Sequence, residues 1–255
     1  MVVERNPELV ELFEEFLGES YRNEVQELAQ AYPERKSLYI EFDDVLSYDA
    51  DLADDWLAQP RVIGGYAEEA LRLYDLPVDV ELGDVSVRLR GLPVSKSPRA
   101  VSKEDFESLV AVEGRVVEAG DVETVLSEGA FSCQRCGTLT RIPQPEQGGL
   151  EEPIECMGCE REGPFEVDQT SSEFREIQVG VVEDVPSVLD GGSPRRLEVV
   201  LDGDVAGELC VGDVVVVSGV VDSQQVDGKV FEFWLDGVAV EAADDEGVER
   251  WREEY

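Results

Sequence analysis

The chain has 255 residues, of which 42% are hydrophobic, and 59 acidic side chains against 21 lysines and arginines give it a formal net charge of −38. The apolar content excludes a wholly disordered chain. It has neither an apolar run of about 18 residues for a membrane span nor a secretion signal, so a cytoplasmic protein without membrane contacts is expected. The acidic residues are spread along the chain, which favours a surface adapted to molar salt; the alternative is an ordinary acidic protein with a solvated surface.

Residues 1–92 are predicted to form a mostly helical subdomain. Asn6 followed by Pro7 is typical of a helix start, because a capping side chain precedes a residue that needs no N–H. Apolar residues then recur at helical spacing as far as Leu28, and Pro33 ends the pattern. The other elements expected here are a strand over 37–42, helices over 49–59 and 66–76, and a strand over 84–92 that leads out of the bundle.

Residues 93–240 change to an alternation of apolar and polar side chains, which indicates strands. The segments that fit are 108–119, 122–133, 174–182, 195–203, 213–221 and 229–241. The Asp227–Gly228 pair between the last two predicts a tight hairpin. Strands of this length and number suit a small closed barrel. The predicted fold class is therefore α+β: an N-terminal helical bundle followed by an OB-fold β-barrel, with residues 241–255 as an acidic tail.

A segment with paired cysteines, residues 130–167, interrupts the predicted barrel. Two Cys-x-x-Cys pairs are separated by 19 residues, and each pair fits a turn that points two sulfurs at one point. Four thiolates suit tetrahedral coordination of zinc, so we predict a zinc ribbon that holds one Zn²⁺. The ligands would be Cys133, Cys136, Cys156 and Cys159. The alternatives are a redox-active pair and thiols without a metal.

The predicted zinc is structural. Four thiolates leave no open position for water or substrate, and so short an insert needs the metal for its folding energy. Gly137 and Gly158 are expected to give the backbone freedom to turn toward the sulfurs. The fifth cysteine, Cys210, is expected to be a small buried apolar residue.

Signals of catalysis are absent from the sequence. The chain has no histidine, which excludes any mechanism that needs an imidazole base or ligand. There is no G-x-x-x-x-G-K-[ST] phosphate loop. With so many carboxylates, chance pairs of acids are certain and none is given a catalytic role. The chain is predicted not to be an enzyme by itself.

Together these pieces resemble the N-terminal region of archaeal, salt-adapted MCM replicative DNA helicases. The likeness covers nearly the whole chain. The segments that carry it are SLYIEFDDVLSYDADLADDW and YAEEALRLYDLPVDVELGDVSVRLRGLP in the helical part, LVAVEGRVVEAGDV in the first barrel strand, AFSCQRCGT with ECMGCE in the zinc finger, and SEFREIQV with GGSPRRLEVVLDGDVAGELCVGDVVVVSGVV in the rest of the barrel. The resemblance implies ring assembly and DNA binding in the ring channel. It places Pro194–Arg195 in the family's control-loop region.

The family's AAA+ ATPase module lies further C-terminal and is missing from this chain, which would make it either a fragment of a longer helicase or a stand-alone truncated relative. Departures from the family pattern favour the second. Basic residues are usual on the channel side, whereas the hairpin sequence SQQVDGKVFEF is short and holds one cation, Lys229. The remaining candidates for contact with nucleic acid are Arg135, Arg195, Arg196 and Lys229. Each could instead form an exposed ion pair of little energetic value.

Two functions are therefore expected from the sequence. The first is a zinc-containing OB-fold module of DNA replication that binds single- or double-stranded DNA weakly and mediates ring assembly with itself or with a full-length MCM helicase. The alternative is a regulatory or interaction paralogue that co-assembles with a full-length helicase, or modulates it, without binding DNA.

Overall fold

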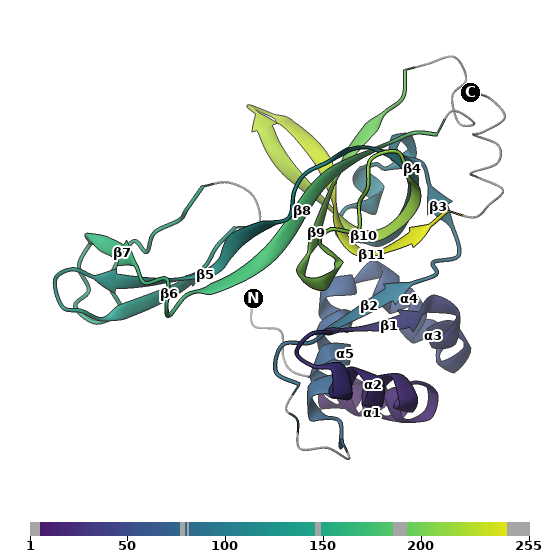
Figure 1. Cartoon of the computed structure of the whole chain (residues 1–255), viewed down its shortest axis with the longest axis horizontal. Helices are drawn as coiled ribbons and strands as arrows, with labels where there is room; N and C mark the ends of the chain where they lie inside the picture. Colours follow the sequence, from purple (N-terminus) through teal and green to yellow (C-terminus); the bar gives the residue numbers. More distant parts are fainter. Residues whose placement is uncertain (1–5, 77–79, 81, 146–148, 186–192, 244–255) are drawn as a thin grey trace.

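The computed structural model describes residues 6–76, 80, 82–145, 149–185 and 193–243. Helices with a small sheet form one part, a β-barrel packs against it, and a long arm leaves the barrel on the side away from β3 (Figure 1). The predicted α+β fold class is confirmed: N-terminal helices precede a large mixed β-sheet that carries a four-cysteine insert. The predicted acidic tail lies outside the described residues from position 244 onward.

The helical part buries one face of each helix in a common core. Its helices are α1 (Pro7–Ser20), α2 (Arg22–Ala31), α3 (Phe42–Tyr48), α4 (Ala50–Ala58) and α5 (Pro60–Leu73). The predicted start of α1 is confirmed, because the side chain of Asn6 accepts the backbone N–H of Glu8 at 3.1 Å. Phe13 of α1 meets Trp56 of α4 edge to face, with ring centroids 5.3 Å apart. Such contacts between helices, rather than helix propensity, hold the bundle together.

The first apolar stripe is divided between two helices. The break falls at Tyr21, whose backbone N–H still bonds to the last turn of α1. The Tyr21 hydroxyl donates to Oδ2 of Asp44 at 2.6 Å and accepts the backbone N–H of Glu41 at 2.9 Å. The chain therefore turns at Tyr21 because this side chain is tied to the start of α3, a contact that periodicity does not reveal.

Two short strands, β1 (Ser37–Glu41) and β2 (Ser86–Arg90), form a parallel pair on the bundle. Both lie within the predicted strand segments, and β2 leads on toward the barrel. Helix α3 follows β1 directly and is not among the predicted elements. It has seven residues and buries Phe42 and Val45, and so short a helix is too brief to show a periodic pattern.

The barrel is closed by strand pairing among the described residues. Its strands are β3 (Ser95–Lys96), β4 (Leu109–Ala119), β8 (Glu173–Glu183), β9 (Arg196–Asp202), β10 (Val214–Asp227) and β11 (Val230–Ala242). The pairing runs β4–β10–β11–β9–β8, and β8 returns to β4 to close the ring. Val112, Val199, Val217 and Leu235 are fully buried inside it. The alternating pattern of the sequence thus reports which side chains face the interior.

The arm consists of the outer half of β8 paired with β5 (Glu123–Cys133). Beyond it, β5 also pairs with β6 (Leu139–Pro143) and β7 (Phe165–Val167). These short strands belong to the cysteine-bearing insert, which lies at the far end of the arm from the helices (Figure 1). Strand β8 is therefore a wall of the barrel at one end and a support of the insert at the other.

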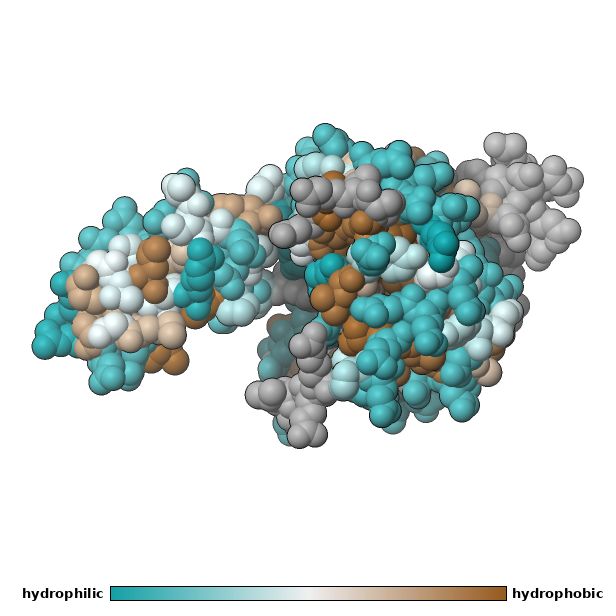
Figure 2. Space-filling view, turned by 90° about the horizontal axis from the view of Figure 1, so that it is seen from below, coloured by the Kyte–Doolittle hydropathy of each residue, from teal (hydrophilic) through white to brown (hydrophobic). Residues whose placement is uncertain are grey.

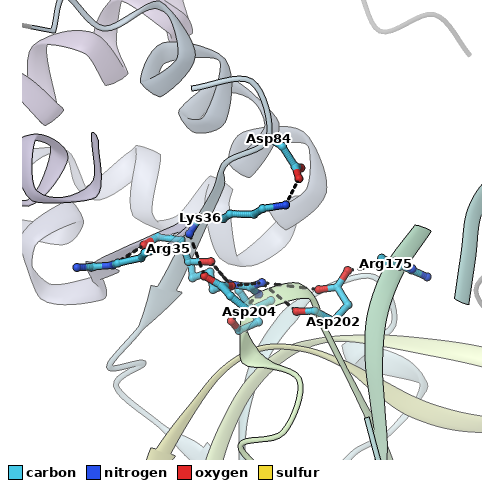
Figure 3. A network of polar contacts seen from close by, with 9 residues as sticks. Arg35, Lys36, Asp84, Arg175, Asp202 and Asp204 are labelled. Atoms are coloured by element: carbon cyan, nitrogen blue, oxygen red, sulfur yellow. Dashed lines mark hydrogen bonds and ion pairs between the residues drawn. The ribbon is translucent and has the colours of Figure 1, made fainter. Parts of the chain in front are cut away.

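A buried arginine joins the helical part to the barrel. Arg88 of β2 is 5% exposed, and its guanidinium donates to Ser37 Oγ at 2.6 Å, to the Val238 carbonyl at 3.0 Å, and to the Asp202 carbonyl and Asp204 Oδ1, both at 3.1 Å. Figure 3 shows Asp202 and Asp204 of the barrel within this network, beside the helical part. Each hydrogen bond from the Arg88 guanidinium to the barrel has its own required geometry, so together these bonds fix how the helical part sits on the barrel.

Hydrophilic residues dominate the face shown in Figure 2, and hydrophobic patches are visible both on the globular body and on the arm with its insert. The insert exposes the apolar side chains of Leu139, Leu150, Ile154 and Met157. Within the described residues, no helix combines the length and the apolar character needed to cross a membrane.

Candidate metal centre and nucleic-acid surface

The first cysteine pair lies in a tight turn at the end of β5. The N–H of Gly137 donates to the Cys133 carbonyl at 2.8 Å, and the N–H of Cys133 donates to the Thr138 carbonyl at 3.0 Å. Gly137 has φ = +78°, a conformation that favours glycine because it has no Cβ. The turn brings Cys133 and Cys136 to the same side, as the Cys-x-x-Cys spacing predicts.

The second cysteine pair repeats this geometry. The N–H of Glu160 donates to the Cys156 carbonyl at 2.9 Å, and Glu160 takes the left-handed conformation, with φ = +54°, that Gly137 takes in the first turn. Gly158 has a different role from the predicted one. A Cβ at Gly158 would collide with the Thr138 side chain, so this glycine allows the two turns to approach each other.

The four sulfurs converge on one point. All lie within 4.8 Å of one another, with 3.9 Å between the sulfurs of Cys133 and Cys159 and 3.6 Å between those of Cys136 and Cys156. A regular tetrahedron with Zn–S bonds of about 2.3 Å would place its sulfurs about 3.8 Å apart. Both the donor set and the spacing of the cluster therefore fit a tetrahedral zinc ion.

The thiols of the cluster differ in acidity. The Thr138 hydroxyl, followed by the Thr138 backbone, lowers the pKa of Cys136 to about 6. Burial, followed by the neighbouring thiol of Cys136, raises the pKa of Cys159 to about 12. The backbone N–H of Arg135 lowers the pKa of Cys133. Because a metal ion binds thiolates, binding to this cluster would release protons and weaken in acid.

Cys210 and Arg135 do not belong to the four-sulfur cluster. Cys210 is exposed, so the prediction of a buried residue was wrong. Its neighbour Leu209 takes the interior position instead, at 2% exposure. The guanidinium of Arg135 donates from Nε to the Gly163 carbonyl at 2.6 Å. Arg135 therefore ties the first cysteine turn to the segment that follows the second cysteine pair.

Arg195 and Arg196 line a hollow of about 420 Å³ between the barrel wall and the β10–β11 hairpin. The backbone N–H of Arg195 donates to Oδ2 of Asp184 at 2.7 Å, and Asp184 is fully buried and also accepts the Nε–H of Arg99 at 2.8 Å. Burial raises the pKa of Asp184, but these hydrogen bonds outweigh it and hold the pKa below its usual value. The backbone at the start of β9 is therefore fixed.

The two arginines differ in their engagement with acids. Arg196 pairs with Glu118 at 3.0 Å and lies 3.7 Å from Glu183, so the alternative of an ion pair with neighbouring acids holds for this residue. Among the described residues, no acid pairs with the side chain of Arg195. The guanidinium of Arg195 is therefore better placed than that of Arg196 to meet an anionic ligand.

The predicted hairpin is present, and its tip carries Lys229. Asp227 pairs with Val230 across the turn, and Gly228 has φ = +51°. The ribbon projects beyond the barrel (Figure 1), and residues 225–232 are all exposed. Among the described residues, no acid pairs with the ammonium of Lys229.

Sequence reasoning missed the aromatic residues of the hairpin. Phe231, Phe233 and Trp234 line the same hollow as Arg195 and Arg196, and Phe231 is 57% exposed. The segment VFEFW was interpreted only as a strand. Phe231 follows closely on the hairpin turn, where neither face of the ribbon is covered by the core. A large aromatic residue in such a place was the signal that could have found it.

The predicted site residues thus fall into two groups that lie apart in the structure. The four cysteines meet at the end of the arm, and Arg195 and Arg196 meet the hairpin beside the barrel. Arg135 belongs to the insert rather than to the second group. Lys229 lies on the same hairpin as Phe231, at its tip.

Comparison with known families gives two matches. The MCM N-terminal domain matches residues 10–90, and the MCM OB domain matches residues 96–225. A crystal structure of the N-terminal domain of an archaeal MCM superposes with a TM-score of 0.76 at 24% sequence identity, covering 93% of this chain and 99% of that one. This likeness shows the fold.

Curated relatives carry the same family name. The minichromosome maintenance protein MCM of Saccharolobus solfataricus is 27% identical over 229 residues, which are 85% of this chain and 33% of that protein. The DNA replication licensing factor MCM4 of Drosophila melanogaster is 24% identical over 178 residues, 68% of this chain and 20% of that protein. The chain therefore spans a third or less of the length of these relatives.

Proposed function

This chain belongs to the MCM family, and from that membership we propose that it is a zinc-containing OB-fold module of the DNA replication machinery. In this role it binds DNA weakly, mediates ring assembly with itself or a full-length MCM helicase, and performs no catalysis by itself. The observation that carries the proposal is the family match over 10–90 and 96–225, joined to a four-sulfur cluster in the OB domain. We further propose that the protein works in the cytoplasm at high salt.

The zinc ion has a structural role in this proposal. Cys133, Cys136, Cys156 and Cys159 would hold it, and four thiolates complete a tetrahedron without leaving a position for substrate. Cys133 and Cys156 are buried, as is Thr140, whose hydroxyl accepts the backbone N–H of Met157 at 3.3 Å. Apart from Ala130 and Phe131 of β5, few apolar side chains of the insert are buried, so its shape depends on the metal.

The DNA surface in this proposal comprises Arg195 and Arg196 beside the hairpin, and Lys229 at its tip. Support comes from their position on one side of the OB barrel and from the absence of an acid partner, among described residues, for Arg195 and Lys229. Each phosphate neutralised on a single strand contributes about −0.7 to the slope of log K against log salt. With two unpaired cations, we expect a shallow slope of about −1.4.

The test is a binding measurement with labelled single-stranded DNA at a salt concentration that keeps the protein folded. Changing Arg195, Arg196 and Lys229 to glutamate is expected to weaken binding at least about tenfold, because phosphate contacts are lost and repulsion is added. A matched control changes Arg22, Arg141 and Arg161 to glutamate, since these exposed residues give the same charge change elsewhere. Equal effects of both triple variants would contradict a local DNA surface.

A second candidate function is a regulatory paralogue that assembles with a full-length MCM helicase without binding DNA. It is favoured by the net charge of −38 and by the engagement of Arg196 with Glu118 and Glu183. Light scattering of the chain alone and mixed with a full-length helicase separates the two. Rings or mixed rings together with no DNA affinity at any salt would favour the second function over the first.

A further inference from the structure

The hollow beside the hairpin combines features that a nucleotide would need. It has a volume of about 420 Å³, within the usual range of about 300–1,000 Å³ for small-molecule sites. One wall is the hairpin, with Gln224, Phe231 and Trp234, and the other is the start of β9, with Arg195 and Arg196. Three acidic side chains also line the hollow: Glu118, Glu198 and Glu232. An aromatic surface, an amide and a cation therefore face the same space, and because carboxylates share the lining, a stacking contact with a base is favoured over a purely ionic one.

Phe231 is the unusual member of this group. Its ring is 57% exposed on a ribbon that projects from the barrel, so it contributes little to the core. The barrel core is complete without it, since the inward positions of β11 are taken by residues such as Leu235. On a surface with so many acids, an exposed aromatic ring offers a contact that does not depend on charge.

We propose that this hollow is a subsite for one unpaired base of single-stranded DNA, stacked on the ring of Phe231, with Arg195 near the adjoining phosphate. The inference rests on the proposed DNA-binding function and names the chemistry of that site. Stacking tolerates any base because every base has a flat π-face. Bases of a duplex are already stacked inside it, so single strands are preferred.

The acidic surface gives a reason for such a contact. Counterion release supplies less affinity as salt increases, and few cations here are unpaired. Stacking involves no release of counterions, so it persists in concentrated salt. Arg195 is suited to its part because its backbone N–H is fixed by the fully buried Asp184.

The experiment measures binding of labelled oligothymidylate and of an oligonucleotide of equal length whose sugars carry no bases, at matched salt. The abasic strand keeps every phosphate and loses every base. We expect oligothymidylate to bind the unaltered protein about tenfold more tightly than the abasic strand. Phe231→Ala should remove most of this difference, and Phe231→Trp should restore it.

The matched control is Val226→Ala, which shortens another exposed apolar side chain of the same hairpin, one that does not line the hollow. It should leave both affinities unchanged, and circular dichroism should show all variants folded. Equal binding of the two strands to the unaltered protein would overturn the stacking subsite while leaving DNA binding intact. If neither strand binds, the proposed function and this inference both fail. Equal binding of duplex and single strands would also overturn the subsite.

Discussion

At the scale of single residues, Arg88 is the side chain on which the arrangement of the two parts depends most. It is buried, yet its hydrogen bonds reach Ser37 on β1 and three groups on the barrel. The Ser37 hydroxyl in turn donates to Asp204 Oδ1 at 2.5 Å. A buried charge is costly unless it is fully paired, so each partner of Arg88 offsets part of its desolvation.

Replacing Arg88 with methionine is therefore expected to destabilise the protein by about 3 kcal/mol, because polar partners at the junction lose their donor. The free energy of unfolding should be measured in urea, since guanidinium would change the ionic strength. Arg90→Met is the matched control: Arg90 lies two residues away, is only partly buried, and pairs with Glu41 at 2.7 Å, so its loss should cost below about 1 kcal/mol. Similar losses for both variants would contradict a special role for Arg88.

Residue by residue, the sequence predicted those features that depend on local spacing. The convergence of the four cysteines followed from two turns of fixed geometry. The role expected for Gly158, freedom of the backbone to turn, was wrong. Its actual role is to leave room for the Thr138 side chain, which lies 20 residues away in the sequence and could not be foreseen from local spacing. Cys210 was expected to be buried, but the buried residue is its neighbour Leu209. Both lie in an irregular turn, where no alternation of apolar and polar residues shows which side chain faces the interior.

At the scale of elements, the insert is the part whose order depends on a ligand. Its strands β6 and β7 have five and three residues. Apart from Phe131 of β5, its large described apolar side chains are exposed or only partly buried. Neither strand was predicted, since both are too short for a pattern and form only by pairing with β5. By contrast, the barrel strands were long enough to show alternation. The division of the first helix was missed because the Tyr21 contacts that cause it come from distant segments.

Removal of one cysteine should disorder the insert and leave the barrel folded. Cys156→Ser is expected to lower bound zinc from one ion per chain to a small fraction, measured by elemental analysis, because three thiolates hold the ion less tightly. Proteolysis should then cleave within residues 134–164. Cys210→Ser is the matched control, since Cys210 is exposed and is not part of the cluster. A full zinc content in Cys156→Ser would contradict the four-sulfur site.

At the scale of the whole molecule, charge dominates. At a net charge of −38 the acidic side chains repel one another, and the range of that repulsion falls from about 10 Å at 0.1 M salt to about 3 Å at 1 M. Ion pairs such as Arg61 with Asp222 and Asp236 relieve part of it at the junction. The net charge follows from composition alone, because it does not depend on how the chain folds, and adaptation to salt stays a prediction.

The expected consequence is a stability that rises with potassium chloride. We expect the free energy of unfolding in urea to increase steadily from low to molar salt, with partial unfolding at the low end, since screening removes repulsion among the acids. Circular dichroism along a salt series provides the measurement. A free energy of unfolding that stays constant across the series would show that the acidic surface is an ordinary solvated one.

The continuity of β8 has a mechanical consequence. One uninterrupted strand is hydrogen-bonded to β4 and β9 in the barrel and to β5 in the arm, so the arm has no joint at its base. A force applied at the cysteine-bearing end is transmitted as leverage on the barrel wall. A load on that end would therefore reach β4 and β9 first, the two strands that β8 pairs with in the barrel.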